Sequence, residues 1–141
     1  LAQLLGAALA WGAAPSARAE ARIGFDTLYD GIGVTGLAFS ARARSLAGKR
    51  VAIAGYVAPP LRLESAFLVL TREPVAVCPF CQSDADWPLD IVAVLLRRAE
   101  PPPPGGTLAV ARGRLELGSA TDPESGFVSQ ARIVDAAISR A

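Results

Sequence analysis

The chain has 141 residues, of which 52% are hydrophobic, and it carries 14 basic and 13 acidic residues but no histidine. This near balance of charge argues against general affinity for nucleic acid, which depends on an excess of Lys and Arg. The lack of histidine excludes Ser-His-Asp and Cys-His enzymes and removes the commonest transition-metal ligand.

Residues 1–19 have the pattern of an export signal. Residues 1–14 are almost wholly apolar, and Pro15-Ser16 separates them from Ala17-Arg18-Ala19. Small residues on both sides of one variable position suit a signal peptidase, so we expect cleavage after Ala19. The apolar run is shorter than the ~20 residues that a bilayer span needs, so no transmembrane segment is expected in the mature chain. The pattern therefore predicts a periplasmic or secreted protein.

The leader lacks the basic residues that normally open such a signal, and the chain contains no Met. We therefore expect the sequence to lack its natural start. A buried N-terminal helix is the alternative interpretation, which the Pro-Ser break suits poorly. Residues 20–141 are enough for one domain with a modest core.

The remaining chain divides into an N-terminal extension, residues 20–47, and a β-rich part, residues 48–141. In the extension, Leu37, Phe39 and Leu46 predict a short helix over residues 37–46, with Gly48 just past its end. The β-rich part has five short apolar segments with turn residues between them, which is typical of a small barrel or sandwich. These segments are residues 51–57, 67–71, 91–96, 108–117 and 127–134.

Two glycines favour the barrel. Leu108 and Val110 are at even positions of the fourth segment, whereas Leu115 and Leu117 are at odd positions. Gly113 lies between the two pairs. A bulge at this glycine would place all four side chains on one face and bend the strand. Gly55 suggests a similar bend in the first strand. Bent first and fourth strands are what a five-stranded oligonucleotide/oligosaccharide-binding (OB) barrel needs to close.

Residues 31–36 match the dinucleotide fingerprint GxGxxG. That site needs a buried strand before the glycines and an acidic residue about 20 positions later for the ribose. The preceding residues, 26–30, are too polar for such a strand, and residues 37–63 contain no Asp or Glu. We therefore predict a turn here and no bound nucleotide.

The most informative motif is Cys78-Pro79-Phe80-Cys81, which holds the chain's two cysteines. In an oxidising compartment the pair can close a disulfide that braces its loop. The same spacing is used by thiol–disulfide oxidoreductases, with Cys78 as nucleophile and Cys81 as resolving thiol, although there a helix lowers the thiol pKa. It is also half of a structural zinc site, or a site for a thiophilic ion such as Cu(I). The motif leaves these alternatives open.

Residues near the motif supply the other candidates. Asp84, Asp86 and Asp90 are the carboxylates that could complete a zinc site, and zinc is the cofactor considered. Phe80 and Trp87, if exposed, would suggest a surface for a partner protein, with Tyr56 on the first strand as a further aromatic contact. The alternative is that the aspartates are solvated and the aromatic rings cover one end of the barrel.

The run Gly48-Lys49-Arg50-Val51-Ala52-Ile53-Ala54-Gly55-Tyr56-Val57-Ala58-Pro59 resembles a family of uncharacterised bacterial periplasmic proteins. Their shared motif is GKxVxIxGYxxP, followed by an FLVL strand (here residues 67–70) and a cysteine-bearing loop (here Cys78). The resemblance implies an exported or lipid-anchored OB-like barrel, accessory to ABC-type transport or metal handling. Glu20 follows the leader where a lipidation cysteine would stand, so we do not expect a lipid anchor.

These observations predict an exported binding or accessory module whose loop from Cys78 to Asp90 is its functional surface. A protein partner in the periplasm is expected. The alternative is a thiol–disulfide oxidoreductase.

Overall fold

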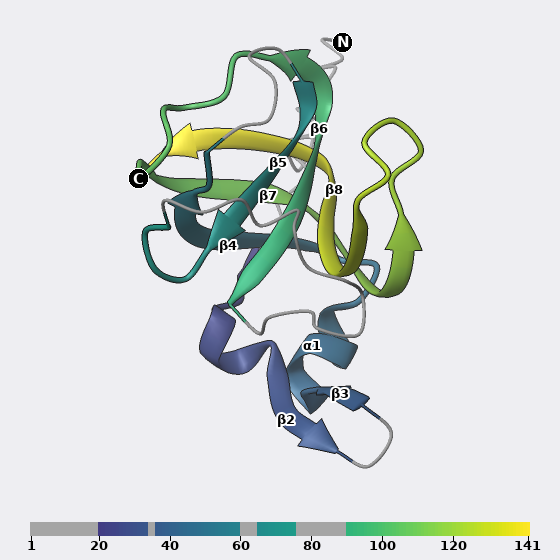
Figure 1. Ribbon diagram of the computed structural model, residues 1–141. Coiled ribbons are helices and arrows are strands. Elements are labelled where there is room, and N and C mark those ends of the chain that lie inside the picture. Colours follow the sequence, from purple (N-terminus) through teal and green to yellow (C-terminus); the bar gives the residue numbers. More distant parts are fainter. Residues whose placement is uncertain (1–19, 34–35, 60–64, 76–89) are drawn as a thin grey trace, which may run out of the picture.

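The computed structural model describes residues 20–33, 36–59, 65–75 and 90–141. They form one six-stranded sheet and a separate two-stranded hairpin, so the prediction of a mainly β protein is confirmed (Figure 1). The elements in chain order are β1 (Ala21–Arg22), the 3-10 helix η1 (Phe25–Thr27), β2 (Tyr29–Gly33), β3 (Gly36–Phe39), α1 (Ala41–Leu46), β4 (Arg50–Val57), β5 (Ser65–Thr71), β6 (Ile91–Glu100), β7 (Leu108–Thr121) and β8 (Val128–Arg140).

The short N-terminal helix is present, but it begins later than predicted. Leu37 and Phe39 belong to β3, which pairs with β2 in an antiparallel hairpin. The Ser40 side chain accepts a hydrogen bond of 2.9 Å from the backbone N–H of Ala43, and this cap starts α1 after Ser40. Gly48 has a φ of +76°, which is the left-handed conformation expected just past a helix end.

The hairpin also accounts for the GxGxxG match. Gly33 lies opposite Gly36 in the pairing of β2 with β3. The glycines therefore stand on two antiparallel strands and not between a parallel strand and a helix, which is the arrangement that a dinucleotide site requires. This antiparallel pairing does not fit a dinucleotide site at residues 31–36.

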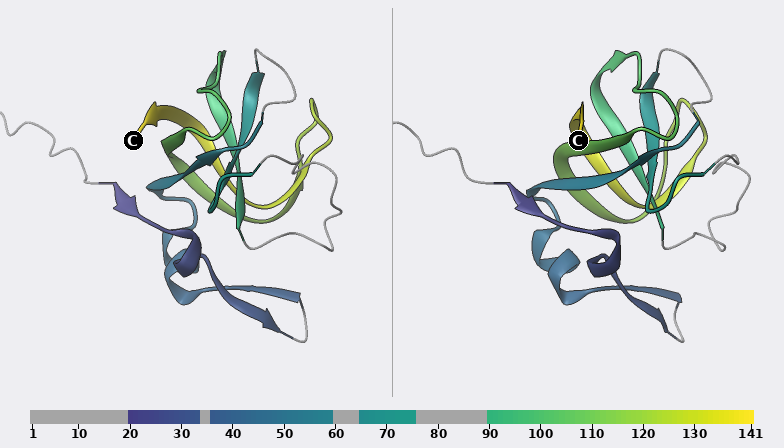
Figure 2. Two further views of the ribbon diagram at one scale, coloured as in Figure 1. Left: turned by 60° about the vertical axis from the view of Figure 1, so that its left-hand side comes forward. Right: turned by 90° about the vertical axis from the view of Figure 1, so that its left-hand side faces the viewer.

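The five predicted strands correspond to β4, β5, β6, β7 and β8. The sheet order is β1-β4-β5-β6-β8-β7, and β7 also pairs with β4, so the five long strands form a closed circuit of neighbours. The β6–β8 pair is parallel, whereas the other pairs of this circuit are antiparallel. Strand β4 pairs with β7 from Arg50 to Tyr56 and with β5 only at Tyr56 and Val57. Figure 2 shows the resulting curvature of the sheet from two further sides.

The side-chain phase along β7 differs from the prediction. Ala109, Ala111 and Leu115 are all buried, so the alternation continues unbroken through Gly113, and Leu108 lies on the opposite face with 42% of its surface exposed. The pairing shifts at this point, where Arg112 lies opposite Ala137 and Arg114 opposite Val134. The extra residue of the bulge therefore belongs to β8. The side chains of β7 continue to alternate between the two faces of the sheet.

Gly55 does not bend β4 by a bulge either. Its pairing with β7 is continuous, and Val51, Ile53 and Val57 alternate regularly as buried residues. The glycine instead makes room for the N-terminal extension, because a Cβ atom there would lie 3.0 Å from the Phe25 ring.

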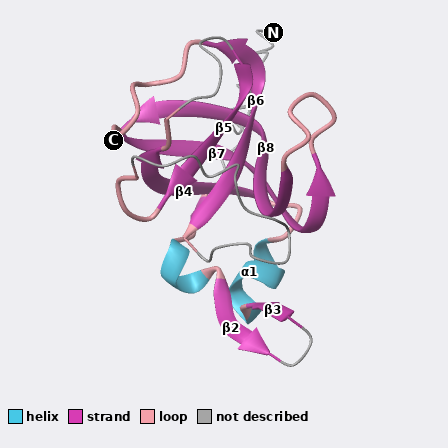
Figure 3. Cartoon of the chain, viewed as in Figure 1, coloured by secondary structure: helices cyan, strands magenta, loops and turns pink. Residues whose placement is uncertain are grey.

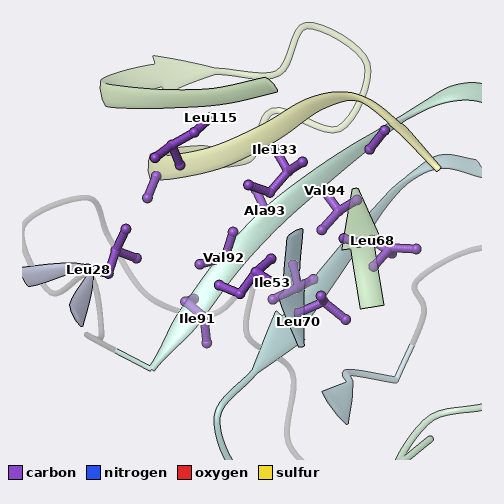
Figure 4. Packing of buried hydrophobic residues seen from close by; sticks show 14 of the residues in the cluster. Leu28, Ile53, Leu68, Leu70, Ile91, Val92, Ala93, Val94, Leu115 and Ile133 are labelled. Carbon is purple, nitrogen blue, oxygen red and sulfur yellow. The ribbon is translucent and has the colours of Figure 1, made fainter. Parts of the chain in front are cut away.

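One hydrophobic core joins the extension to the sheet. Leu28, which is fully buried, extends from the N-terminal segment toward strand residues such as Ile91 and Leu115 (Figure 4). The helices lie at one end of the sheet, and the β2–β3 hairpin projects beyond them, away from the sheet (Figure 3). No helix in the described part of the chain is long and apolar enough to cross a membrane.

Candidate functional site

The cysteine motif belongs to the connection between two neighbouring strands. Thr71 at the end of β5 pairs with Ile91 at the start of β6, and the Arg72 backbone N–H donates a 2.8 Å hydrogen bond to the Asp90 carbonyl. These contacts form the stem of the loop. Most of the predicted site residues lie outside the described residues, namely Cys78, Phe80, Cys81, Asp84, Asp86 and Trp87.

The stem is anchored by a buried hydroxyl. Thr71 is 1% exposed, and its Oγ1 donates to the carbonyl oxygen of Glu73 at 2.6 Å and to that of Tyr56 at 3.3 Å. Ile91, across the stem, is 4% exposed and belongs to the core. A hydrogen-bonded and buried base holds the two ends of the loop at a defined separation.

The structure brings the two described candidates, Tyr56 and Asp90, to the same end of β5. Tyr56 is the cross-strand partner of Thr71, and Thr71 is the partner of Ile91, which directly follows Asp90. Both residues are half-buried. Tyr56 also lies opposite Leu108 of β7, so its side chain is on the outer face of the sheet.

The zinc prediction is not tested by the described residues. Of its five candidate ligands only Asp90 is among them. No group of three His, Cys, Asp or Glu side chains that could hold a metal ion occurs within residues 20–33, 36–59, 65–75 and 90–141.

Sequence reasoning missed a second charged feature, which connects four strands. Glu20 bridges Arg50 and Arg112, at N–O distances of 3.4 and 3.6 Å. Asp135 bridges Arg50 and Arg97, at 3.7 and 2.9 Å. The sequence alone does not indicate this role of Arg50, because its partners are distant in the chain and depend on the strand register.

Two further arginines extend this feature along β7 and β8. Glu116 lies 3.1 Å from Arg114 and 3.2 Å from Arg132. Arg132, whose side chain is 12% exposed, also donates a 2.7 Å hydrogen bond to the Gly118 carbonyl. The only signal in the sequence was the spacing of Arg112, Arg114 and Glu116, which places them on one face of a strand.

Comparisons of the chain with models of protein families, with curated proteins and with solved structures gave no match. The class that the fold itself defines is a mainly β protein with a closed circuit of strands.

Proposed function

We propose that the chain is an exported binding or accessory module of the periplasm, in which the loop between β5 and β6 contacts a partner protein. Under this proposal residues 1–19 are the export leader, and Cys78 and Cys81 brace the loop by a disulfide or link it through a metal ion. The resemblance to periplasmic proteins accessory to ABC-type transport or metal handling supports the same assignment.

The fold that suits this role is a five-stranded OB-type barrel. The closed circuit of pairings supports it, as does the parallel β6–β8 pair, which places the last strand between the third and fourth strands of the circuit. In barrels of this type the face of the second and third strands takes part in recognition, and these strands correspond to β5 and β6, which the loop connects.

The observation that carries the proposal is the length of chain between two strands that are already neighbours. Residues 72–90 join Thr71 to its partner Ile91. Antiparallel neighbours need only about two to five connecting residues. Long connections in compact domains are usually functional. The extra chain here includes both cysteines of the protein and the aromatic residues Phe80 and Trp87.

The first experiment determines the state of the two thiols. The protein is produced with its leader in a bacterial periplasm, trapped by alkylation and examined by intact mass and metal analysis. A disulfide with a reduction potential below about −300 mV supports a structural brace. A stoichiometric metal whose removal exposes both thiols supports the metal-linked form. The matched control is the Cys78→Ser/Cys81→Ser variant, which must lose the disulfide or the metal while it remains folded.

The same experiment can overturn the proposal. A potential in the range of exchange enzymes, about −120 to −270 mV, together with catalysed reduction of a model disulfide, would establish the oxidoreductase alternative. Retention of an intact leader in the cytoplasm, after a Met and basic residues are added before Leu1 to complete the signal, would contradict the export assignment.

The partner contact is tested separately by photo-crosslinking. A crosslinking amino acid at Trp87 should capture a periplasmic protein, whereas the same amino acid at Glu124, in the exposed turn before β8, should not. Equal capture at both positions would contradict a specific surface on the loop.

A further inference from the structure

The arginines described above occupy one face of the sheet. In β7, Ala111 and Leu115 point to the core, so Arg112 and Arg114, at the alternate positions, lie on the outer face. Arg50 of β4 is the direct cross-strand partner of Arg114. We define the arginine face as Arg50, Arg97, Arg112, Arg114 and Arg132 together with Glu20, Glu116 and Asp135, which connect them.

The arginine face has more positive than negative charge. It has five arginines and three carboxylates, and each carboxylate is shared by two arginines. The whole chain, by contrast, has a formal net charge of only +1. The arginine face therefore has a formal charge of 5 − 3 = +2, and the other residues of the chain together have +1 − 2 = −1.

Stability does not account for the four exposed arginines of this face, Arg50, Arg97, Arg112 and Arg114. Like charges directly opposite each other on neighbouring strands, such as Arg50 and Arg114, are destabilising. The compensating ion pairs are solvent-exposed, with Arg50, Arg97 and Arg112 side chains 43–52% exposed, and such pairs contribute only about 0–1 kcal/mol each.

The ion pairs nevertheless hold the guanidinium groups in position. A guanidinium has five N–H donors, more than one carboxylate can accept. Arg97, for example, meets Asp135 through Nε and is 52% exposed. Arginines that are already held in place and half-exposed lose less conformational entropy when a further carboxylate binds.

An apolar strip continues the same outer face. Tyr56 lies opposite Leu108, and Ala54 lies opposite Val110, two residues before Arg112. Leu108 is 42% exposed. Among the residues that the structure describes, it is the only large hydrophobic residue with an exposed side chain. Tyrosine and arginine are enriched in protein interfaces and among the residues that dominate binding energy.

We propose that the arginine face and the Tyr56–Leu108 strip together dock an acidic segment of a partner protein. Carboxylates of this segment bind Arg112 and Arg114, and an apolar side chain covers Leu108. A nucleic acid fits less well, because its affinity depends on a larger excess of positive charge than this face has. Arg112, Arg114 and Leu108 lie on β7 and not in residues 72–90, so the inference goes beyond the proposed function.

The test uses a fluorescent glutamate-rich peptide that contains one leucine, and the same peptide with Gln in place of Glu. We expect saturable binding of the Glu peptide alone, measured by anisotropy, with amide NMR shifts centred on Leu108, Arg112 and Arg114. Arg114→Gln should weaken binding roughly tenfold or more, as expected for a residue that dominates an interface. The matched control is Arg44→Gln, which removes an exposed arginine of α1 that does not belong to the arginine face. Thermal unfolding checks that both variants fold.

Three results would overturn the inference. These are absence of binding by the Glu peptide, equal loss of affinity in Arg44→Gln and Arg114→Gln, and tighter binding of duplex DNA or anionic vesicles at the same amides. The Cys78→Ser/Cys81→Ser variant should bind the peptide with unchanged affinity. Failure of this inference is therefore distinguishable from failure of the role assigned to the cysteine loop.

Discussion

The backbone of Val134 lies so close to Gly113 that β7 has no room for a side chain at this position. A Cβ atom on Gly113 would be 2.5 Å from the Val134 carbonyl oxygen and 3.0 Å from the Cα atom of Ala136. The cause is the β8 bulge, in which Asp135 has a φ of +49° and adds an extra residue opposite the glycine. The bulge in β8 therefore explains why β7 has a glycine at position 113.

The first prediction is that Gly113→Ala destabilises the protein by about 1–3 kcal/mol, the usual cost of overpacking. Backbone atoms of β8 would have to move to admit the methyl group. The measurement is the midpoint of urea unfolding. Gly105→Ala is the control, because a Cβ atom there meets its nearest neighbour at 3.4 Å, and its unfolding midpoint should stay the same or rise slightly. Equal midpoints for the two variants would contradict the bulge geometry.

The second prediction concerns the contribution of the N-terminal extension to the core. Leu28 is 0% exposed and packs in the same cluster as the strand residues. Leu28→Ala should cost about 2–5 kcal/mol, the range for removing a buried leucine side chain, and unfolding should remain a single transition. Leu108→Ala, at an exposed position, should change stability by no more than about 0.5 kcal/mol. A separate early transition that alone responds to Leu28→Ala would show that the extension unfolds independently.

The third prediction concerns the stem of the cysteine loop. Thr71→Val keeps the shape of the side chain but removes the hydroxyl that donates to Glu73 and Tyr56. We expect a loss of about 1 kcal/mol and faster hydrogen exchange at the Arg72 amide, which closes the stem. Thr121→Val, at an exposed position near the end of β7, should leave both quantities unchanged. Unaltered exchange at Arg72 in Thr71→Val would mean that the hydroxyl does not anchor the stem.

The fourth prediction concerns Arg132, the least exposed arginine of the arginine face. Its guanidinium binds Glu116 and the Gly118 carbonyl, beside a second bulge in which β7 carries the extra residue. Arg132→Ala should cost about 1.5–3 kcal/mol, as expected for hydrogen bonds to a charged group. Arg132→Lys should recover only part of this, because an ammonium group lacks the planar fork of donors. Full recovery by lysine would show that charge, and not geometry, is what this position requires.

Local patterns predicted the strands well. The signals of a strand are its apolar residues and the turn-forming residues on either side, and both can be recognised from neighbouring positions in the sequence. The five β segments and the glycine cap at Gly48 follow from such patterns. The start of α1 was predicted too early, because the hydrophobic spacing of Leu37 and Phe39 fits a hairpin strand equally well. The Ser40 cap was the missing signal.

Features that depend on register could not be predicted in the same way. The bulge near Gly113 was placed on the wrong strand, because the sequence of β7 does not reveal which strand carries the extra residue. The bridges from Glu20 and Asp135 join residues far apart in the chain, and their pairing becomes visible only after β4, β7 and β8 are aligned. For the candidate site, the structure places Tyr56 and Asp90 at one stem, whereas the role of the cysteines stays a prediction.

The position of β8 has a consequence for the order in which the protein folds. This strand pairs with β6 on one side and β7 on the other, so the circuit cannot close until the last strand of the chain is present. Contacts between residues distant in the sequence form slowly, because their loops must close first. A chain that is still being synthesised therefore cannot complete its native sheet until β8 has left the ribosome.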